Sequence, residues 1–249
     1  MKSLEKIWAV FVRELGAYFL SPIAWVVIFL FLMVNGITFH VFTRIFAGQP
    51  RQITLIVESL FGFSLFWILP LSPILTMRLF AEEKRSGSLE LLLTAPVTEL
   101  ECVMGKFLAA QAFYSLIWLS LLPLLVILEV LGQPDWGPIW ADYCGIFFLG
   151  FLTSSIGILA SASTRNQLVS AILALSGNLL LFYVSLGQSL LPEDAVNGRM
   201  LVRYVSFTSH FEGEYSRGII DLRYVFLYLS FSALFLFFTV RIVEARKWR

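Results

Sequence analysis

Six long apolar runs constrain this chain more than any other feature of its sequence. They cover about residues 22–42, 55–77, 99–130, 139–162, 167–190 and 222–243. Each reaches the roughly 20 residues that a helix needs to cross about 30 Å of hydrocarbon. Open strands would leave backbone polar groups unpaired in lipid, so the runs are predicted to be helices. The expected fold class is an all-α integral membrane protein with six transmembrane helices in one domain, residues 1–249.

The composition excludes several classes of protein. Hydrophobic residues make up 58% of the chain and charged residues 14%, whereas soluble domains carry about 25% charge. The formal net charge of +1 gives no field that would attract nucleic acid. The two histidines and two cysteines do not stand at the spacings of metal ligands. We therefore expect membrane lipids as surroundings, no metal site and no nucleic-acid partner.

The segment at about residues 3–17, before the first span, has an apolar stripe at helical spacing. The stripe consists of Leu4, Ile7, Trp8, Phe11 and Leu15. Charged residues lie away from it, which predicts a helix lying in the membrane interface. The alternative is a helix that caps the protein's own core.

The basic residues predict the orientation. With both termini in the cytoplasm, twelve of the 18 Lys and Arg residues fall in cytoplasmic segments and six in external ones. Cytoplasmic loops normally carry the excess of Lys and Arg. The sequence therefore predicts a multi-pass protein of the bacterial cytoplasmic (inner) membrane with its N and C termini inside.

The cytoplasmic loop at about residues 78–98 joins a charged cluster to a short apolar run. The cluster consists of Glu82, Glu83, Lys84 and Arg85. Gly87, between two serines, should break the helix. The apolar run then contains Leu89, Glu90, Leu91 and Leu92. A short helix of this kind, within about residues 82–95, can insert into a groove of a soluble partner and transmit its motion to the second and third spans. The alternative is a turn that lies on lipid.

The start of the third span also has a local signal. Thr98 is followed three residues later by Glu101. This spacing is typical of a capping box, in which the two residues satisfy each other's backbone N–H groups.

The fourth span carries a face of small residues. Gly150, Ser154, Gly157 and Ser161 recur at intervals of four, three and four. Small residues at helical spacing permit close helix approach. This face is expected to pack within the subunit, or alternatively to lie on a dimer seam or a translocation path.

The external segment at about residues 192–221 mixes aromatic and charged residues. We single out Tyr204, Phe207, His210, Phe211 and Tyr215 as an external gate or a partner surface. Aromatic rings among charges suit short helices at the level of the lipid headgroups. A docking surface for an extracytoplasmic partner is the alternative.

The chain lacks the motifs of an ATPase. Gly105-Lys106 is followed by Phe107, and position 100 is Leu, so the phosphate-binding glycine loop is not formed. Ionisable residues are also scarce at the predicted middle of the spans, where ion-driven carriers keep a buried charge. The chain is therefore expected not to be an enzyme and to hold no cofactor, with energy supplied by a separate subunit.

Residues 82–97, followed by Gly105-Lys106, resemble the signature of ABC-2 type transporter permeases. The resemblance implies that residues 82–95 form the coupling helix that docks on an ATP-binding subunit, and that residues 3–17 form the elbow helix. It also implies re-entrant external helices that close the outer end of the pathway. Ser21-Pro22, Asn35-Gly36 and residues 206–222 are similar to the gliding-motility-associated branch, whose members also occur in organisms that do not glide.

From this resemblance we expect the permease subunit of an ATP-driven exporter. Its partners would be an ABC ATPase subunit that holds ATP and Mg, and a second permease subunit, identical or related. A membrane protein with an extracytoplasmic domain is a further candidate partner. The alternative function is a mechanical or scaffold subunit that acts on an extracytoplasmic partner without moving cargo.

Overall fold

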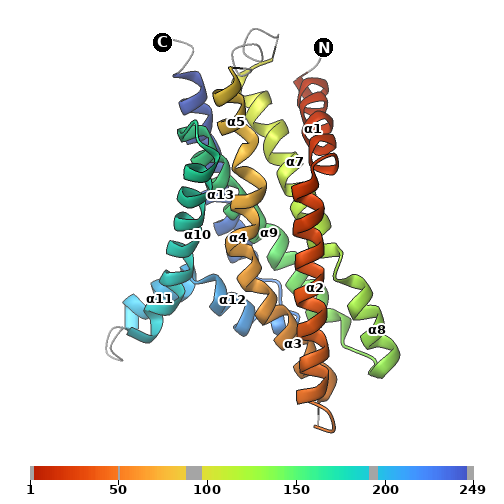
Figure 1. The fold of residues 1–249 in the computed structure, drawn as a ribbon. Coiled ribbons are helices and arrows are strands. Elements are labelled where there is room, and N and C mark those ends of the chain that lie inside the picture. Colours follow the sequence, from red (N-terminus) through yellow and green to blue (C-terminus); the bar gives the residue numbers. More distant parts are fainter. Residues whose placement is uncertain (1–2, 50, 88–96, 191–195, 246–249) are drawn as a thin grey trace.

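The computed structural model describes residues 3–49, 51–87, 97–190 and 196–245. In this part of the chain the structure is a bundle of helices and contains no strand. Figure 1 shows the long helices running roughly side by side between two ends of the molecule. The first half comprises α1 (Ser3–Phe19), α2 (Pro22–Ile45), α3 (Gln52–Ser64), η1 (Leu65–Trp67), α4 (Ile68–Thr76) and α5 (Arg78–Ser86).

The second half begins after residues 88–96, which the structure does not describe. It comprises α7 (Glu99–Leu119), α8 (Leu122–Gly132), α9 (Trp136–Ser163), α10 (Gln167–Leu190), α11 (Val196–Val205), α12 (Phe207–Gly213), η2 (Tyr215–Arg217) and α13 (Leu222–Glu244). The start of α7 confirms the predicted capping box. Glu101 N–H donates to Thr98 Oγ1 at 3.3 Å, and Thr98 N–H donates to Glu101 Oε2 at 2.9 Å.

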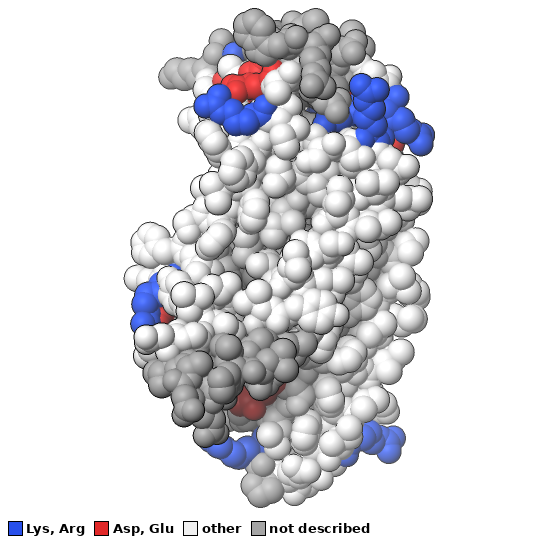
Figure 2. All heavy atoms as spheres, turned by 90° about the vertical axis from the view of Figure 1, so that its left-hand side faces the viewer, with Lys and Arg blue, Asp and Glu red and all other residues white. Residues whose placement is uncertain are grey.

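Six helical segments of the described chain are long and apolar enough to cross a membrane, which confirms the predicted fold class. They are Pro22–Ile45, Gln52–Ser86, Glu99–Gly132, Trp136–Ser163, Gln167–Val184 and Leu222–Glu244. Figure 2 shows on one face a band without charged side chains, which separates the charged end at the top from charged residues farther down. A charge-free band of this kind is what a hydrocarbon layer requires.

Two of the spans are interrupted where proline removes a backbone donor. The third span breaks between Leu119 and Leu122, beside Pro123. The second span passes through a short 3-10 turn, η1, just before Pro70. Proline lacks the N–H that would complete the helical hydrogen-bond ladder, so a kink or break at these places is expected.

Helix α9 forms the centre of the bundle. In its most apolar stretch 67% of the residues are buried, against 17–39% in the other five spans. Its small-residue face lies inside the subunit: a Cβ added to Gly150 would collide with Tyr114 of α7, and one added to Gly157 would collide with Thr76 of α4. Ser154 and Ser161 on the same face are fully buried. These four residues therefore let α9 approach its neighbours closely.

Polar side chains inside the spans connect neighbouring helices. Asn178 on α10 donates to Leu69 O and Ser72 Oγ of α4, at 3.3 and 3.0 Å. Gln111 on α7 donates to Phe147 O of α9 at 2.9 Å. Ser64 on α3 donates to Asn35 on α2. In hydrocarbon such groups need a partner, and here each finds one on another helix.

The two ends of the bundle differ. The start of α1, the end of α13 and the end of α5 lie together at one end, which we call the N/C end, whereas α11, α12 and the start of α3 lie toward the other, which we call the α12 end (Figure 1). The predicted orientation requires α5 and both termini on the same side. Which end faces the cytoplasm stays a prediction.

Candidate functional site

Helix α5 extends the second span at the N/C end and leads directly into residues 88–96. It ends at Ser86, and Gly87 follows with a φ of +76°. A left-handed residue after the last helical turn is a common helix stop, and glycine adopts it without steric cost. The predicted break at Gly87 is thus confirmed. Most polar side chains of α5 contact other helices.

A buried lysine joins α5 to α1 and α7. Lys106 of α7 is 1% exposed, and its Nζ lies 2.9 Å from Glu14 Oε1 of α1 and 2.8 Å from Glu83 Oε1 of α5. It also donates to Leu79 O of α5 at 2.8 Å. An ammonium group has three N–H donors, and all three are used. Arg13 of α1 completes this group, 3.1 Å from Glu83 Oε1; we call these four charged residues the Lys106 cluster.

The charges of the Lys106 cluster balance, with two cations facing two carboxylates. Burial alone would raise the pKa of Glu14, but Lys106 and Arg13 outweigh burial and hold this pKa below its ordinary value. Glu14 is therefore ionised at neutral pH. A neighbouring glycine makes the approach possible, because a Cβ on Gly105 would lie 2.6 Å from Val10 Cβ of α1. The cluster thus holds α1, α5 and α7 at fixed positions.

The hydroxyl of a serine of α9 lies between backbone N–H and C=O groups at the start of α5. Ser161 Oγ accepts from Phe80 N and Ala81 N, at 3.0 and 3.1 Å, and donates to Met77 O at 3.0 Å. In an unbroken helix Ala81 N–H would donate directly to Met77 O. A side chain inserted into this ladder bends a helix. Ser161 therefore both creates the junction between α4 and α5 and ties it to α9.

Two further polar contacts bind the side of α5 to α9 and α10. The Lys84 ammonium donates to Ala162 O in the last turn of α9. A cation is favourable there, because the carbonyl groups at a helix C-terminus are unpaired and carry partial negative charge. Gln167, the first residue of α10, donates to the Glu82 carboxylate. Both contacts hold α5 against the end of α9 and the start of α10, at the N/C end of the bundle.

The first residue of α5 contacts the junction between α1 and α2. Arg78 donates to Ser21 Oγ at 2.8 Å, and its guanidinium lies 5.0 Å from the centre of the Tyr18 ring. The Tyr18 hydroxyl donates to Leu75 O of α4 at 2.7 Å. Together with the contacts above, α5 is bound to α1, α7, α9 and α10 by directional polar bonds. A displacement of α5 must therefore move or break contacts to α1, α7, α9 and α10.

The residues predicted to couple to a partner fall into three groups. Glu82, Glu83 and Lys84 are directed at neighbouring helices and anchor α5. Arg85, with a 71% exposed side chain, and Gly87 are open to solvent. The remaining predicted residues lie outside the described residues: Leu89, Glu90, Leu91 and Leu92.

Sequence reasoning missed the anchoring partners. It placed the charged residues of segment 3–17 away from the apolar stripe, assigned no partner to Lys106, and treated Ser161 as part of a packing face. One signal was available: Lys106 lies within the third apolar run, where an ionisable residue needs a partner. No local pattern identifies that partner, because Glu14 is 92 residues away along the chain.

The residues predicted to form an external gate or partner surface form a packed layer at the α12 end. Phe207, His210, Phe211 and Tyr215 are at most 4% exposed, whereas Tyr204 is 43% exposed. His210 Nε2 lies 3.1 Å from Tyr204 O and its Nδ1 lies 2.7 Å from the Tyr228 hydroxyl of α13. Burial lowers the pKa of His210 to about 4. The ring is therefore neutral at neutral pH, which fits one donated and one accepted hydrogen bond.

The fold and these sites define a class: a polytopic α-helical membrane protein whose polar contacts concentrate at one end of the bundle. The sequence comparison gives the family. Residues 20–181, well over half of the 249, match a family model described as ABC-2 family transporter protein. The chain belongs to this family. No curated protein matches the chain.

Replacing Ser161 by alanine tests the inserted hydroxyl. Ser161→Ala removes the acceptor of Phe80 N–H and Ala81 N–H. A buried donor left without an acceptor lowers the free energy of unfolding by about 1–3 kcal/mol. We expect lower thermal stability of the purified protein and faster hydrogen exchange over α5. The matched control is Ser163→Ala, because Ser163 is exposed and bonds only to Leu159 O of its own helix. Equal exchange over α5 in the two variants would contradict this role.

Replacing Lys106 by methionine tests the Lys106 cluster. Lys106→Met leaves two largely buried carboxylates, Glu14 and Glu83, facing only the half-exposed Arg13. Removing one partner of a buried ion-pair group should lower the free energy of unfolding by up to about 3–5 kcal/mol. The melting temperature of the detergent-solubilised protein measures this loss of stability. Replacing Glu14, Glu83 and Lys106 together by methionine removes the buried charges and leaves only Arg13, whose side chain is 50% exposed. This triple variant should therefore recover most of the lost stability. A single variant as stable as the wild type would show that the cluster does not hold the helices.

Proposed function

We propose that this chain is the transmembrane permease subunit of an ATP-driven ABC-2 transporter, and that α5 with residues 88–95 receives force from a separate ATPase subunit. The family supports a membrane component of a transporter. The observation that carries the proposal is the binding of α5 to α1, α7, α9 and α10. A segment that only needed to lie on lipid would not require these buried polar bonds.

The proposed mechanism places the N/C end in the cytoplasm. There the leucine-rich residues 89–92 dock into the ATPase subunit, which holds ATP and Mg. Closure of two ATPase subunits on ATP moves α5, and the Lys106 cluster and Ser161 pass this motion to the spans. Residues 82–84 act as anchors, and Arg85 with the leucines acts as the docking surface.

Two permease subunits, identical or related, would pair in the inner membrane. The faces available for pairing and for lipid are apolar: α2 exposes Trp25, Phe29 and Ile37, each more than half accessible. We propose export as the direction of transport. We also propose a relation to the gliding-motility-associated branch, supported by residues 206–222, which contain α12 and η2. This relation carries no implication that the source organism glides.

A mechanical or scaffold function is the second candidate. The observation in its favour is the exposed side of α11, where Met200, Leu201 and Tyr204 are 69%, 68% and 43% accessible. This side suits docking of an extracytoplasmic partner, including a membrane protein with a large external domain. In this case the ATP-driven motion would act on the partner and move no cargo.

Two substitutions that change the charge of the docking surface test the proposed coupling to the ATPase subunit. Arg85→Glu and Leu91→Arg should each reduce co-purification of the ATPase subunit at least several-fold, because they alter the proposed docking surface and replace no residue of the Lys106 cluster. Arg241→Glu is the matched control. Arg241 is exposed near the end of α13, at the same end of the bundle, and pairs only with Glu244 of its own helix.

Membrane insertion and thermal stability of all three variants should match the wild type. If the ATPase subunit co-purifies equally well with Arg85→Glu and Leu91→Arg, the proposed docking surface is wrong. Glu83→Arg is unsuitable for this test, since it would also disrupt the Lys106 cluster and thereby the fold.

Reconstitution separates transport from mechanical action. Proteoliposomes that contain this chain and its ATPase subunit should show ATP-dependent movement of a lipid or glycan from one leaflet or compartment to the other. ATP hydrolysis that depends on this chain, without movement of any substrate tested and with a bound extracytoplasmic partner, would favour the scaffold function.

A further inference from the structure

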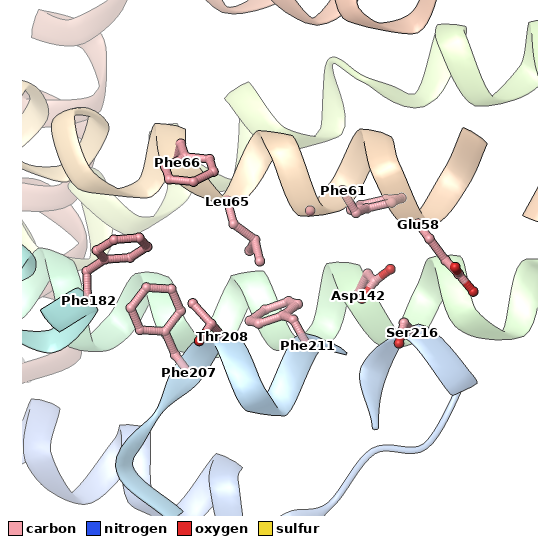
Figure 3. Close-up of a pocket in the computed structure, with 11 residues that line it drawn as sticks. Glu58, Phe61, Leu65, Phe66, Asp142, Phe182, Phe207, Thr208, Phe211 and Ser216 are labelled. Atoms are coloured by element: carbon pink, nitrogen blue, oxygen red, sulfur yellow. The ribbon is translucent and has the colours of Figure 1, made fainter. Parts of the chain in front are cut away.

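A cavity of about 360 Å³ lies at the α12 end, between the second, fourth and fifth spans and the external layer. Its wall combines two carboxylates with several phenylalanine rings (Figure 3). Its volume is within the range of small-molecule sites in proteins, about 300–1,000 Å³. Neither the anchoring of α5 nor the predicted gate explains why acidic residues face this space.

The first carboxylate, Asp142 of α9, is buried and has no partner. It is 2% exposed, and within the described chain it takes part in no hydrogen bond and no ion pair. Figure 3 shows its carboxyl group directed into the cavity, toward the side on which Glu58 lies. Burying an unpaired carboxylate is costly. A charged or polar ligand in the cavity would offset this cost.

The second carboxylate, Glu58 of α3, stands at the opening of the cavity. Its residue is exposed and it lines the same space as Asp142. No lysine or arginine of the described residues forms a salt bridge with either carboxylate. The cavity therefore offers two carboxyl groups, one at the entrance and one at depth, without a cation of the protein.

The rest of the wall favours an organic cation over a metal ion. The rings that line the cavity come from α3, η1, α10 and α12 and belong to Phe61, Phe66, Phe182, Phe207 and Phe211. Ring faces attract ammonium groups and also accommodate an apolar body. Divalent cations such as Ca²⁺ or Mg²⁺ need six or more oxygen ligands. The described residues contain no group of three or more metal-ligating side chains.

We propose that this cavity binds an amphiphilic organic amine, with its ammonium group between Asp142 and Glu58 and its apolar body among the phenylalanine rings. An alkylammonium group has three N–H donors and can donate to both carboxylates. Because Phe207 and Phe211 belong to α12, the ligand would also connect α12 to α3 and α9. Binding at this site can be measured on this chain without the ATPase subunit, so a failure of this proposal and a failure of the coupling mechanism are distinguishable.

The test uses three probes of the same shape and different charge. The full chain is reconstituted in nanodiscs of zwitterionic lipid, and empty nanodiscs serve as the background for partitioning. Calorimetry with 4-phenylbutylamine should show saturable binding. The neutral 4-phenylbutanol and the anionic 4-phenylbutyrate should bind at least about tenfold more weakly, since they cannot replace a charge-assisted hydrogen bond. Equal binding of the alcohol would overturn the proposal.

Two isosteric variants assign the site. Asp142→Asn and Glu58→Gln should each weaken binding of 4-phenylbutylamine at least about tenfold. Glu58 is exposed, so its variant keeps the test valid even if Asp142→Asn does not fold. The matched control is Glu129→Gln, because Glu129 lies near the same end of the bundle and bonds to Trp136 outside the cavity. Undiminished amine binding by Glu58→Gln, or an equal loss in the control, would refute the assignment.

Discussion

The buried ion pairs of Lys106 are the interaction on which the arrangement at the N/C end depends. An ammonium group with 1% exposure and three filled donor positions cannot shift without losing a partner that water does not replace. Taking such charges out of water costs about as much as their attraction returns. What the cluster provides is therefore geometry: it fixes Glu14 of α1, Glu83 of α5 and Lys106 of α7 in one arrangement.

Polar bonds and apolar contacts transmit motion differently. Apolar surfaces can slide past one another at small cost, because the hydrophobic effect has no direction. Hydrogen bonds weaken steeply with angle and distance. The three bonds of Ser161 and the contacts of Lys84 and Glu82 therefore make α5 move together with the ends of α9 and α10. Farther from this end the spans are joined mainly by apolar contacts, with a few polar bonds such as that of Asn178 to Leu69 O.

The sequence predicted what bilayer thickness and local chain chemistry determine. The six spans follow from apolar run lengths, the start of α7 from Thr98 and Glu101, and the end of α5 from Gly87. The anchors were not predictable in the same way, because their partners come from distant parts of the chain. Ser161 has the small size expected of a packing residue, and only the fold brings its hydroxyl between Met77 O and Ala81 N. Residues 88–96, which include the predicted docking leucines, lie outside the described structure.

The buried polar groups near the two ends of α9 differ in their hydrogen bonding. Near its end, Ser161 has all its bonds within the protein; near its start, the buried Asp142 has none among the described residues. The 19 residue steps from Asp142 to Ser161 correspond to about 28 Å of helix, nearly the thickness of the hydrocarbon layer. Because α9 is the most buried span, a ligand that neutralises Asp142 would stabilise the same helix that α5 holds at the other end. Occupancy of the cavity and motion of α5 would then both act on α9, which gives a physical route for coupling between them.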